Sequence, residues 1–263
     1  MSKPQMVQSV TRAVGLLLAL ERGPRSLAGL VEATGLSKAT AHRLLASLSF
    51  GQLVIQDPIT AEYLLGPGCF GIGDAVLRGF GGLDVIANPV LERLLEETGE
   101  TVALHVRIGL LRICVGQLPS PQPVRYVARV GAAQPLYVGG AGKVILAFSQ
   151  EDVRKEILDR IELKPVTDST IIDRTILDRE INQIRNDGYA TSHGENVVGG
   201  MSVSVPVLGE DGGIVAALSV IGPDARLSES NIDALISSLL RAADEIAALL
   251  SRAGSNAQSI QPA

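Results

Sequence analysis

Residues 26–48 constrain the fold most, because their apolar positions fit two short helices that one glycine separates. Ser26 stands where it can cap the first helix, and Gly35 can end it. Ser37 is placed to cap the second helix. The residues that would pack the two helices together follow the helical period: Leu27, Leu30, Val31, Leu36, Ala41, Leu44, Leu45 and Leu48. This spacing is typical of a helix-turn-helix, whose second helix enters the major groove of DNA.

The start of the second helix carries the candidate DNA-contacting side chains. These polar or basic residues lie at or beside its exposed N-terminal half: Ser37, Lys38, Thr40, His42 and Arg43. Side chains at this end of a recognition helix reach base edges and phosphates. For Lys38 and Arg43 the alternative is an ordinary solvated charge. For the whole segment the alternative is a small helical domain that contacts other proteins.

The flanking segments complete a winged helix-turn-helix. An earlier helix, ended by Gly23 and Pro24, has apolar residues at three- and four-residue steps that predict one buried face: Val7, Val10, Val14, Leu17 and Leu18. Residues 53–55 and 62–65 read as two short strands around a turn, which is the wing. The turn has no Lys or Arg, so we expect the wing to add shape and little neutralisation of phosphate charge.

The charge is distributed unevenly along the chain. Residues 1–66 hold six Lys/Arg against four Asp/Glu, whereas the remainder holds 17 against 24. A mildly basic head on an acidic body permits DNA contact by the head alone. The longest early apolar run, residues 13–20, is far shorter than the roughly 20 residues of a membrane span, and no signal peptide is evident. Two isolated cysteines, Cys69 and Cys114, fit a reducing, cytoplasmic setting.

The rest of the chain predicts an α+β domain with an antiparallel sheet. Expected helices cover residues 89–98, 142–148, 150–161 and 173–187, and a final helix of about 24 residues that Ser228 caps. Expected strands cover residues 101–107, 111–117, 124–130, 201–208 and 213–221. The domain organisation is then a winged helix-turn-helix in 1–68, a linker helix in 69–84, an effector and oligomerisation domain in 85–255 and a disordered tail in 256–263.

Two glycine patterns imitate nucleotide-binding motifs without their context. Residues 66–71 match G-x-G-x-x-G, but a wing strand precedes them and Pro67 interrupts the loop. Gly142 and Lys143 lack the remaining residues of a phosphate-binding loop. The three histidines have no metal-ligand spacing, and no nucleophile, base and orienting group occur together. We therefore expect no catalytic residues, no metal and no cofactor.

Residues 139–142 open a helix with three glycines and an alanine, so their backbone N–H groups could hold a carboxylate. The alternative is a glycine turn that packs the helix tightly on the sheet. Lys143 and Glu195 form a candidate ion pair, which we take as structural in preference to a ligand contact.

The chain resembles the IclR-type bacterial transcription regulators over about residues 9–250. The matching stretches include SVTRAVGLLLAL, SLAGLVEATGLSKATAHRLLASL and EYLLGPGCFGIG in the head. PLYVGGAGKVILAF and GYATSHGENVVGGMSVSVPVLGEDGGIVAALSVIGP match in the body. Val31 stands where that family more often has Ala, and Ser192 where some members have an acid.

This resemblance implies a GAF-like effector domain with a small-molecule pocket. Carried over residue by residue, the pocket takes seven residues: Gly140, Ala141, Ser192, Gly200, Ser202, Ser219 and Ile221. Serine hydroxyls beside apolar surface are typical of such sites. The resemblance also implies homodimers through the head and linker, and tetramers through the bodies.

The sequence thus predicts a cytoplasmic regulator, with repression favoured, that binds a roughly palindromic double-stranded operator. A small-molecule effector, in our hypothesis a small organic acid, would modulate that binding. Two alternatives remain open: an enzyme with a DNA-binding-like head, and a regulator whose body only oligomerises. The operator and the effector itself are not encoded in any pattern that we recognise.

Overall fold

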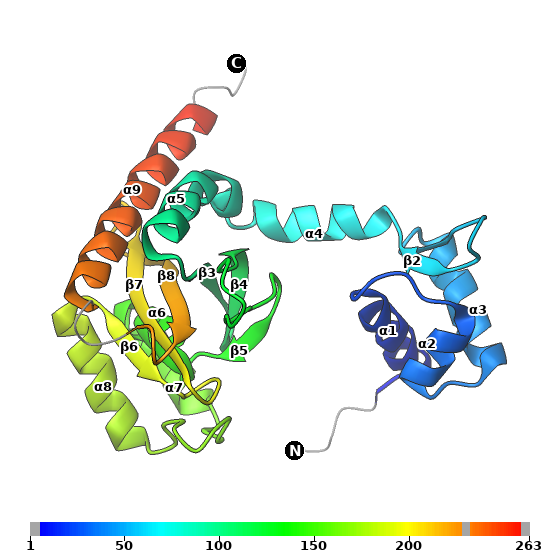
Figure 1. Cartoon of the computed structure of the whole chain (residues 1–263), viewed down its shortest axis with the longest axis horizontal. Helices are drawn as coiled ribbons and strands as arrows, with labels where there is room; N and C mark the ends of the chain where they lie inside the picture. The colour runs from blue at the N-terminus through cyan, green and yellow to red at the C-terminus, as the bar shows by residue number, and fades with distance from the viewer. Residues whose placement is uncertain (1–5, 228–231, 259–263) are drawn as a thin grey trace. The chain divides into compact units, whose positions relative to one another are not determined.

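The computed structural model describes residues 6–227 and 232–258. The chain divides into two compact units, Met1–Phe80 and Gly81–Ala263, which we call the head and the body. Figure 1 shows a mostly helical head and a body in which helices cover a sheet. Among the described residues, no helix combines the length and the apolar character needed to cross a membrane.

The head has the expected three helices and two-stranded wing, followed by a fourth helix. Its elements are α1 (Gln8–Leu20), α2 (Leu27–Thr34), α3 (Lys38–Phe50), β1 (Val54–Gln56), β2 (Tyr63–Leu65) and α4 (Gly68–Arg78). Ser26 caps α2 by accepting a hydrogen bond from the Gly29 N–H at 3.1 Å, and Gly35 ends that helix in the left-handed conformation at φ 68°. The local rules for caps therefore explain both boundaries of α2.

The head's core lies between α1, α2, α3 and the wing. Its buried members are Leu16, Leu20, Leu30, Ala41, Leu45, Leu48, Val54 and Tyr63. The predicted inner face of α1 is wrong: Val7, Val10, Val14 and Leu18 are 47–64 % exposed, and only Leu17 packs on the core. Helix α1 is apolar on two faces, so its periodicity could not determine which face meets α2 and α3.

The glycines after the wing serve close packing of the backbone. A Cβ atom on Gly66 would lie 2.3 Å from the Gln52 carbonyl oxygen, and one on Gly68 would lie 2.9 Å from the same atom. The head's two strands pair antiparallel, so no βαβ unit surrounds the G-x-G-x-x-G run. These glycines let the chain leave the wing and begin α4.

The body contains a six-stranded antiparallel sheet in the order β5-β4-β3-β8-β7-β6. Its strands are β3 (Thr101–Ile108), β4 (Leu111–Leu118), β5 (Ala133–Pro135), β6 (Ala190–His193), β7 (Gly200–Leu208) and β8 (Ile214–Pro223). The long hairpin β7–β8 places Ser202 opposite Ile221 and Ser204 opposite Ser219. The α+β class and the antiparallel sheet are confirmed.

Helices cover both faces of this sheet (Figure 1). One layer consists of α5 (Leu83–Thr98) and α9 (Ile232–Gln258), and the other consists of α6 (Gly139–Phe148), α7 (Glu151–Arg160) and α8 (Arg174–Asp187). Side chains of α6, α7 and α8 form a continuous apolar core with Ala190 and Ala217 of the sheet. This core fixes the N-terminus of α6 against the strands.

Several predicted element boundaries are wrong. Helix α5 starts at Leu83, after Gly82 at φ 73°, so Pro89 lies inside the helix and does not open it. Residues 69–84 are not one helix, because α4 ends at Arg78. Residues 124–130 form a loop, which hydrogen bonds from Thr101 Oγ1 to the Tyr126 carbonyl and from Arg226 Nη2 to the Val124 carbonyl hold in place.

Other predicted boundaries in the body also differ from those in the structure. Helix α6 starts at Gly139, three residues before the predicted start. The expected cap Ser228 lies outside the described residues. Helix α9 continues to Gln258, so residues 256–258 of the predicted tail are helical, and residues 259–263 lie outside the described residues.

Candidate functional site

The N-terminal half of α3 presents its polar side chains to solvent, as the sequence predicted. Lys38, His42 and Arg43 are exposed. Ser37 Oγ accepts a hydrogen bond from the Thr40 N–H at 3.3 Å and donates one to Thr40 Oγ1 at 2.9 Å. Ser37 and Thr40 thus fix the start of the helix, while the three exposed side chains are available to a ligand.

A groove lies beside these side chains, between α1 and α3. It has a volume of about 310 Å³ and is lined by Ser9, Arg12, Thr40, Arg43, Leu44 and Ser47. Arg12 brings a second guanidinium to the edge where Arg43 is exposed. Sequence reasoning did not single out Arg12, because it belongs to the preceding helix and only the packing of α1 on α3 places it there.

The wing carries no positive charge at its tip. Asp57 Oδ1 accepts hydrogen bonds from the Thr60 and Ile59 N–H groups, both at 2.8 Å. These backbone hydrogen bonds, that of Thr60 foremost, lower the pKa of Asp57. The turn is therefore ordered and anionic, and Ile59 is 91 % exposed at its end.

A cavity in the body collects every residue that the family resemblance implied for the effector. It lies between the start of α6 and strands of the sheet, and it leaves about 40 Å³ for the centres of water-sized molecules. The seven implied residues line it: Gly140, Ala141, Ser192, Gly200, Ser202, Ser219 and Ile221. The structure brings them together, and their binding role stays a prediction.

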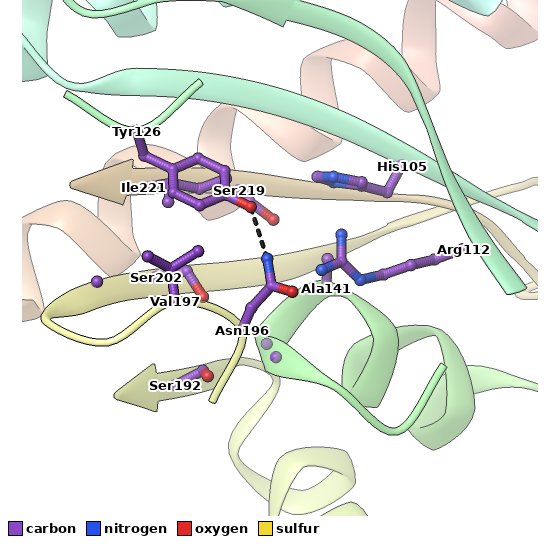
Figure 2. A pocket seen from close by; sticks show the side chains of 13 residues that line it. His105, Arg112, Tyr126, Ala141, Ser192, Asn196, Val197, Ser202, Ser219 and Ile221 are labelled. Atoms are coloured by element: carbon purple, nitrogen blue, oxygen red, sulfur yellow. Dashed lines mark hydrogen bonds between the residues drawn. The ribbon is translucent and has the colours of Figure 1, made fainter. Parts of the chain in front are cut away.

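Further residues line the cavity that the sequence did not indicate. They are His105, Arg112, Tyr126, Asn196 and Val197, and Gly139 of the predicted helix start lines the cavity as well. Figure 2 shows His105 and Arg112 at one end of the cavity and Tyr126 with Ile221 at the other. Asn196 Nδ2 donates a hydrogen bond to Tyr126 Oη, and both side chains line the cavity. Arg112 and His105 lie on expected strands, and the one available signal was their charge or polarity inside an otherwise apolar strand pattern.

The glycines at the start of α6 serve close packing and the cavity together. Gly139 has φ 76°, in the left-handed region. A Cβ atom on Gly142 would lie 2.2 Å from the Leu136 carbonyl oxygen, which supports the tight-packing alternative for that residue. A Cβ atom on Gly140 would lie 2.8 Å from Ser204 Oγ and 3.1 Å from Ser202 Oγ, so a side chain there would fill space beside the cavity.

The serines of the cavity differ in how their hydroxyls are engaged. Ser219 Oγ and Ser204 Oγ share a hydrogen bond of 2.8 Å in the sheet. Ser192 is buried and Ser202 is half-buried, and both hydroxyls line the cavity without a hydrogen-bond partner among the described residues. Ser192 and Ser202 are therefore the serines best placed to meet a ligand.

A buried cluster of charges holds the start of α6. Lys143 Nζ, which is fully buried, forms ion pairs with Glu195 and with Glu180 of α8. Glu195 Oε2 also accepts a hydrogen bond from the Gly139 N–H at 3.2 Å. The structure therefore supports the structural reading of the Lys143–Glu195 pair, and it adds Glu180 as a third member.

No described part of the chain brings three His, Cys, Asp or Glu side chains together in a way that could hold a metal ion. The head offers exposed cationic and hydrogen-bonding side chains on one helix, and the body offers a partly open cavity with polar and apolar lining at a helix N-terminus.

Comparisons with known proteins agree with this division. Residues 9–58 match the family described as IclR helix-turn-helix domain, and residues 82–248 match Bacterial transcriptional regulator IclR C-terminal. The HTH-type transcriptional repressor AllR of Salmonella paratyphi A is 33 % identical over 224 residues, which cover 84 % of this chain and 82 % of that protein.

Solved structures share the fold. The IclR structure from Thermotoga maritima has a TM-score of 0.78 and 31 % identity, and the match covers 92 % of this chain and 98 % of that one. An IclR homologue from Microbacterium hydrocarbonoxydans, solved in complex with 4-hydroxybenzoate, has a TM-score of 0.75 and 24 % identity. That match covers 93 % of this chain and 100 % of the homologue, and at this identity it is evidence for the fold alone.

Proposed function

The chain belongs to the IclR family of bacterial transcriptional regulators, and from that premise we propose that it is a repressor whose binding to an operator is set by a small organic acid in the body's cavity. The family and its relatives are DNA-binding regulators and not enzymes. The observation that carries the proposal is that one chain holds both a helix with exposed basic side chains at its start and a cavity with polar and apolar lining.

In the head, we assign DNA contact to the start of α3. Lys38 and Arg43 would neutralise phosphates or reach bases, and His42 lies beside them on the exposed face. Ser37 and Thr40 order the first turn, whose free N–H groups favour a phosphate. The wing would contribute shape, since its tip is anionic.

A single head of this size makes few base contacts, so useful specificity requires two heads on a palindromic operator. The exposed apolar residues of α1, with Val10, Val14 and Leu18 on one stripe, give a surface for pairing with the head of a second copy. The effector then changes operator binding because it has a different affinity for the protein with its two heads spaced to fit the operator than for the protein with its heads spaced otherwise.

The test is fluorescence anisotropy of the full-length protein on DNA from upstream of its own gene, at two salt concentrations. We expect binding that is stronger than on scrambled DNA and that weakens with salt. Arg43→Ala should lower the affinity by about 10- to 100-fold and reduce the salt dependence by about one phosphate contact.

Arg22→Ala is the matched control, because Arg22 is an exposed arginine of the head outside α3. Its affinity for the fragment should stay near that of the wild type. Equal binding to the upstream and scrambled fragments, or equal losses in the two variants, would contradict the assignment of α3.

A further inference from the structure

Arg112 is a buried cation whose charge the protein leaves unpaired. Its side chain lies on β4, and the residue is 7 % exposed. Its Nε donates a hydrogen bond to the Val138 carbonyl at 3.3 Å, and within residues 6–227 and 232–258 its guanidinium makes no other hydrogen bond and no ion pair. Burial lowers the pKa of Arg112, in keeping with the cost of holding this charge away from water.

The carboxylate of Glu195 acts on this guanidinium through its charge but forms no ion pair with it, because both of its oxygens have other partners. Glu195 Oε1 pairs with Lys143, and Glu195 Oε2 accepts from the Gly139 N–H. A Cβ atom on Gly139 would lie 3.6 Å from Arg112 Nη2, so the guanidinium sits beside the first residue of α6. The positive end of that helix and the cation therefore act on the same space.

Two buried polar atoms of residues that line the cavity with Arg112 also lack hydrogen-bond partners. His105 is 1 % exposed, and its Nδ1 has no hydrogen bond; Asn196 Oδ1 has none either. Burial, with the charge of Arg112, holds the pKa of His105 well below its usual value, so the imidazole is neutral. A neutral imidazole nitrogen and an amide oxygen can accept hydrogen bonds. Figure 2 shows both side chains directed into the cavity near Arg112.

The cavity is small in this conformation. Its space of about 40 Å³ for the centres of water-sized molecules corresponds to about three waters. A ligand that replaces those waters must be a short molecule, and an anionic group on it would compensate the buried cation.

We propose that Arg112 binds the carboxylate of the effector and that an acceptor on His105 or on Asn196 takes the hydrogen of an effector hydroxyl group, so that the effector class is a short aliphatic hydroxy acid. The inference rests on the proposed function, because it names the chemistry of the same cavity. In this proposal the carboxylate of the effector is bound by the Arg112 side chain, and not by the N-terminus of α6 alone.

The first experiment measures thermal unfolding of the ligand-free protein and its Arg112→Met variant. Removing an unpaired buried charge while keeping the side-chain volume should raise the melting temperature of the body by about 2–4 °C. The control Arg107→Met changes an exposed arginine of the same hairpin and should leave the melting temperature unchanged. A lower melting temperature for Arg112→Met would show a structural role and overturn the proposal.

The second experiment titrates the wild-type protein by calorimetry with glycolate, lactate, acetate and glycolamide. Glycolate or lactate should bind about tenfold or more tightly than acetate, which lacks the hydroxyl, and than glycolamide, which lacks the charge. Arg112→Met should weaken glycolate and lactate binding by about 10- to 100-fold, and Arg107→Met should not. Equal affinity for glycolate and glycolamide, or no binding of either hydroxy acid, would overturn the proposal.

Operator binding separates this inference from the function on which it rests. If Arg112→Met binds the upstream fragment as the wild type does while hydroxy acids fail to bind either protein, the effector chemistry is wrong and DNA binding by the head stands. If neither protein binds the fragment specifically, the proposed function itself fails.

Discussion

At the residue scale, the ionisable groups buried in the body make its stability depend on pH. His105 is enclosed on β3, with burial as the main cause of its lowered pKa and the nearby Arg112 charge as the second. In the unfolded chain the same imidazole titrates near 6.5. The unfolded state therefore binds a proton below that pH while the folded state does not.

We predict that the body loses stability as the pH falls below 6.5, by up to about 1.4 kcal/mol per pH unit from this residue. Replacing His105 with Gln should reduce that slope in melting temperature between pH 7.5 and pH 5. The control His193→Gln, at an exposed position on β6, should keep the slope. Identical pH profiles for the wild type and His105→Gln would contradict the account.

Lys143 gives a second prediction at this scale. Lys143→Met removes the only buried cation of its cluster and leaves the carboxylate of Glu195, itself 5 % exposed, without its partner. The free energy of unfolding of the body should fall by about 3–5 kcal/mol, measured by chemical denaturation. Lys155→Met, which breaks an exposed ion pair with Glu151, should have no measurable effect. Equal effects of the two changes would be evidence against a structural cluster.

The site could be predicted only in part at this scale. Ser202, Ser219 and the glycines of α6 could be predicted, because each lies in a stretch of sequence that resembles a motif of the family. The roles of Arg112 and His105 could not be predicted from the sequence. The period of a strand indicates which face of the sheet a side chain lies on, but it does not indicate which residues of distant elements will contact that side chain. The significance of these two residues depends on the partners that they lack among the described residues, an ion pair for Arg112 and a hydrogen bond for His105 Nδ1, and this is a property of the folded body.

At the element scale, the start of α6 brings the glycines, the cavity and the charge cluster together. Gly142→Ala should lower the stability of the body by about 1–3 kcal/mol, because the new methyl group would overlap the Leu136 carbonyl oxygen. Gly15→Ala, in α1 with no atom within 4 Å of the new Cβ, should raise the stability of the head by about 0.5–1 kcal/mol. Thermal unfolding of the two variants measures both; a stabilised Gly142→Ala protein would contradict the close approach.

Element prediction succeeded where caps and turns were local. Ser26, Gly35 and Ser37 define helix ends in the structure as the sequence indicated. It failed where tertiary contacts decide. Residues 124–130 have the composition of a strand but form a loop. The side chains of Thr101 and Arg226 donate hydrogen bonds to two backbone carbonyl groups of this segment. Helix α5 continues through Pro89 because its first turn begins at Leu83, before the residue that the sequence rule favoured as a start.

At the scale of the whole molecule, pairing of heads is the requirement for reading a palindromic operator. Replacing Val10 and Leu18 of α1 with Lys places charges on the exposed apolar stripe and should shift the full-length protein toward smaller species in sedimentation velocity. It should also weaken operator binding. Gln8→Lys, at an exposed polar position of the same helix, is the control. Unchanged assembly in the double variant would exclude α1 as the pairing surface.

We propose that a ligand in the body's cavity controls DNA binding by the head. The most direct measurement is operator affinity by anisotropy with and without a hydroxy acid at a concentration that calorimetry shows to fill the cavity. We predict that the ligand changes the affinity of the wild type by about 5- to 150-fold and leaves that of Arg112→Met unchanged. Operator affinity that stays the same in the wild type with the cavity filled would contradict the claim.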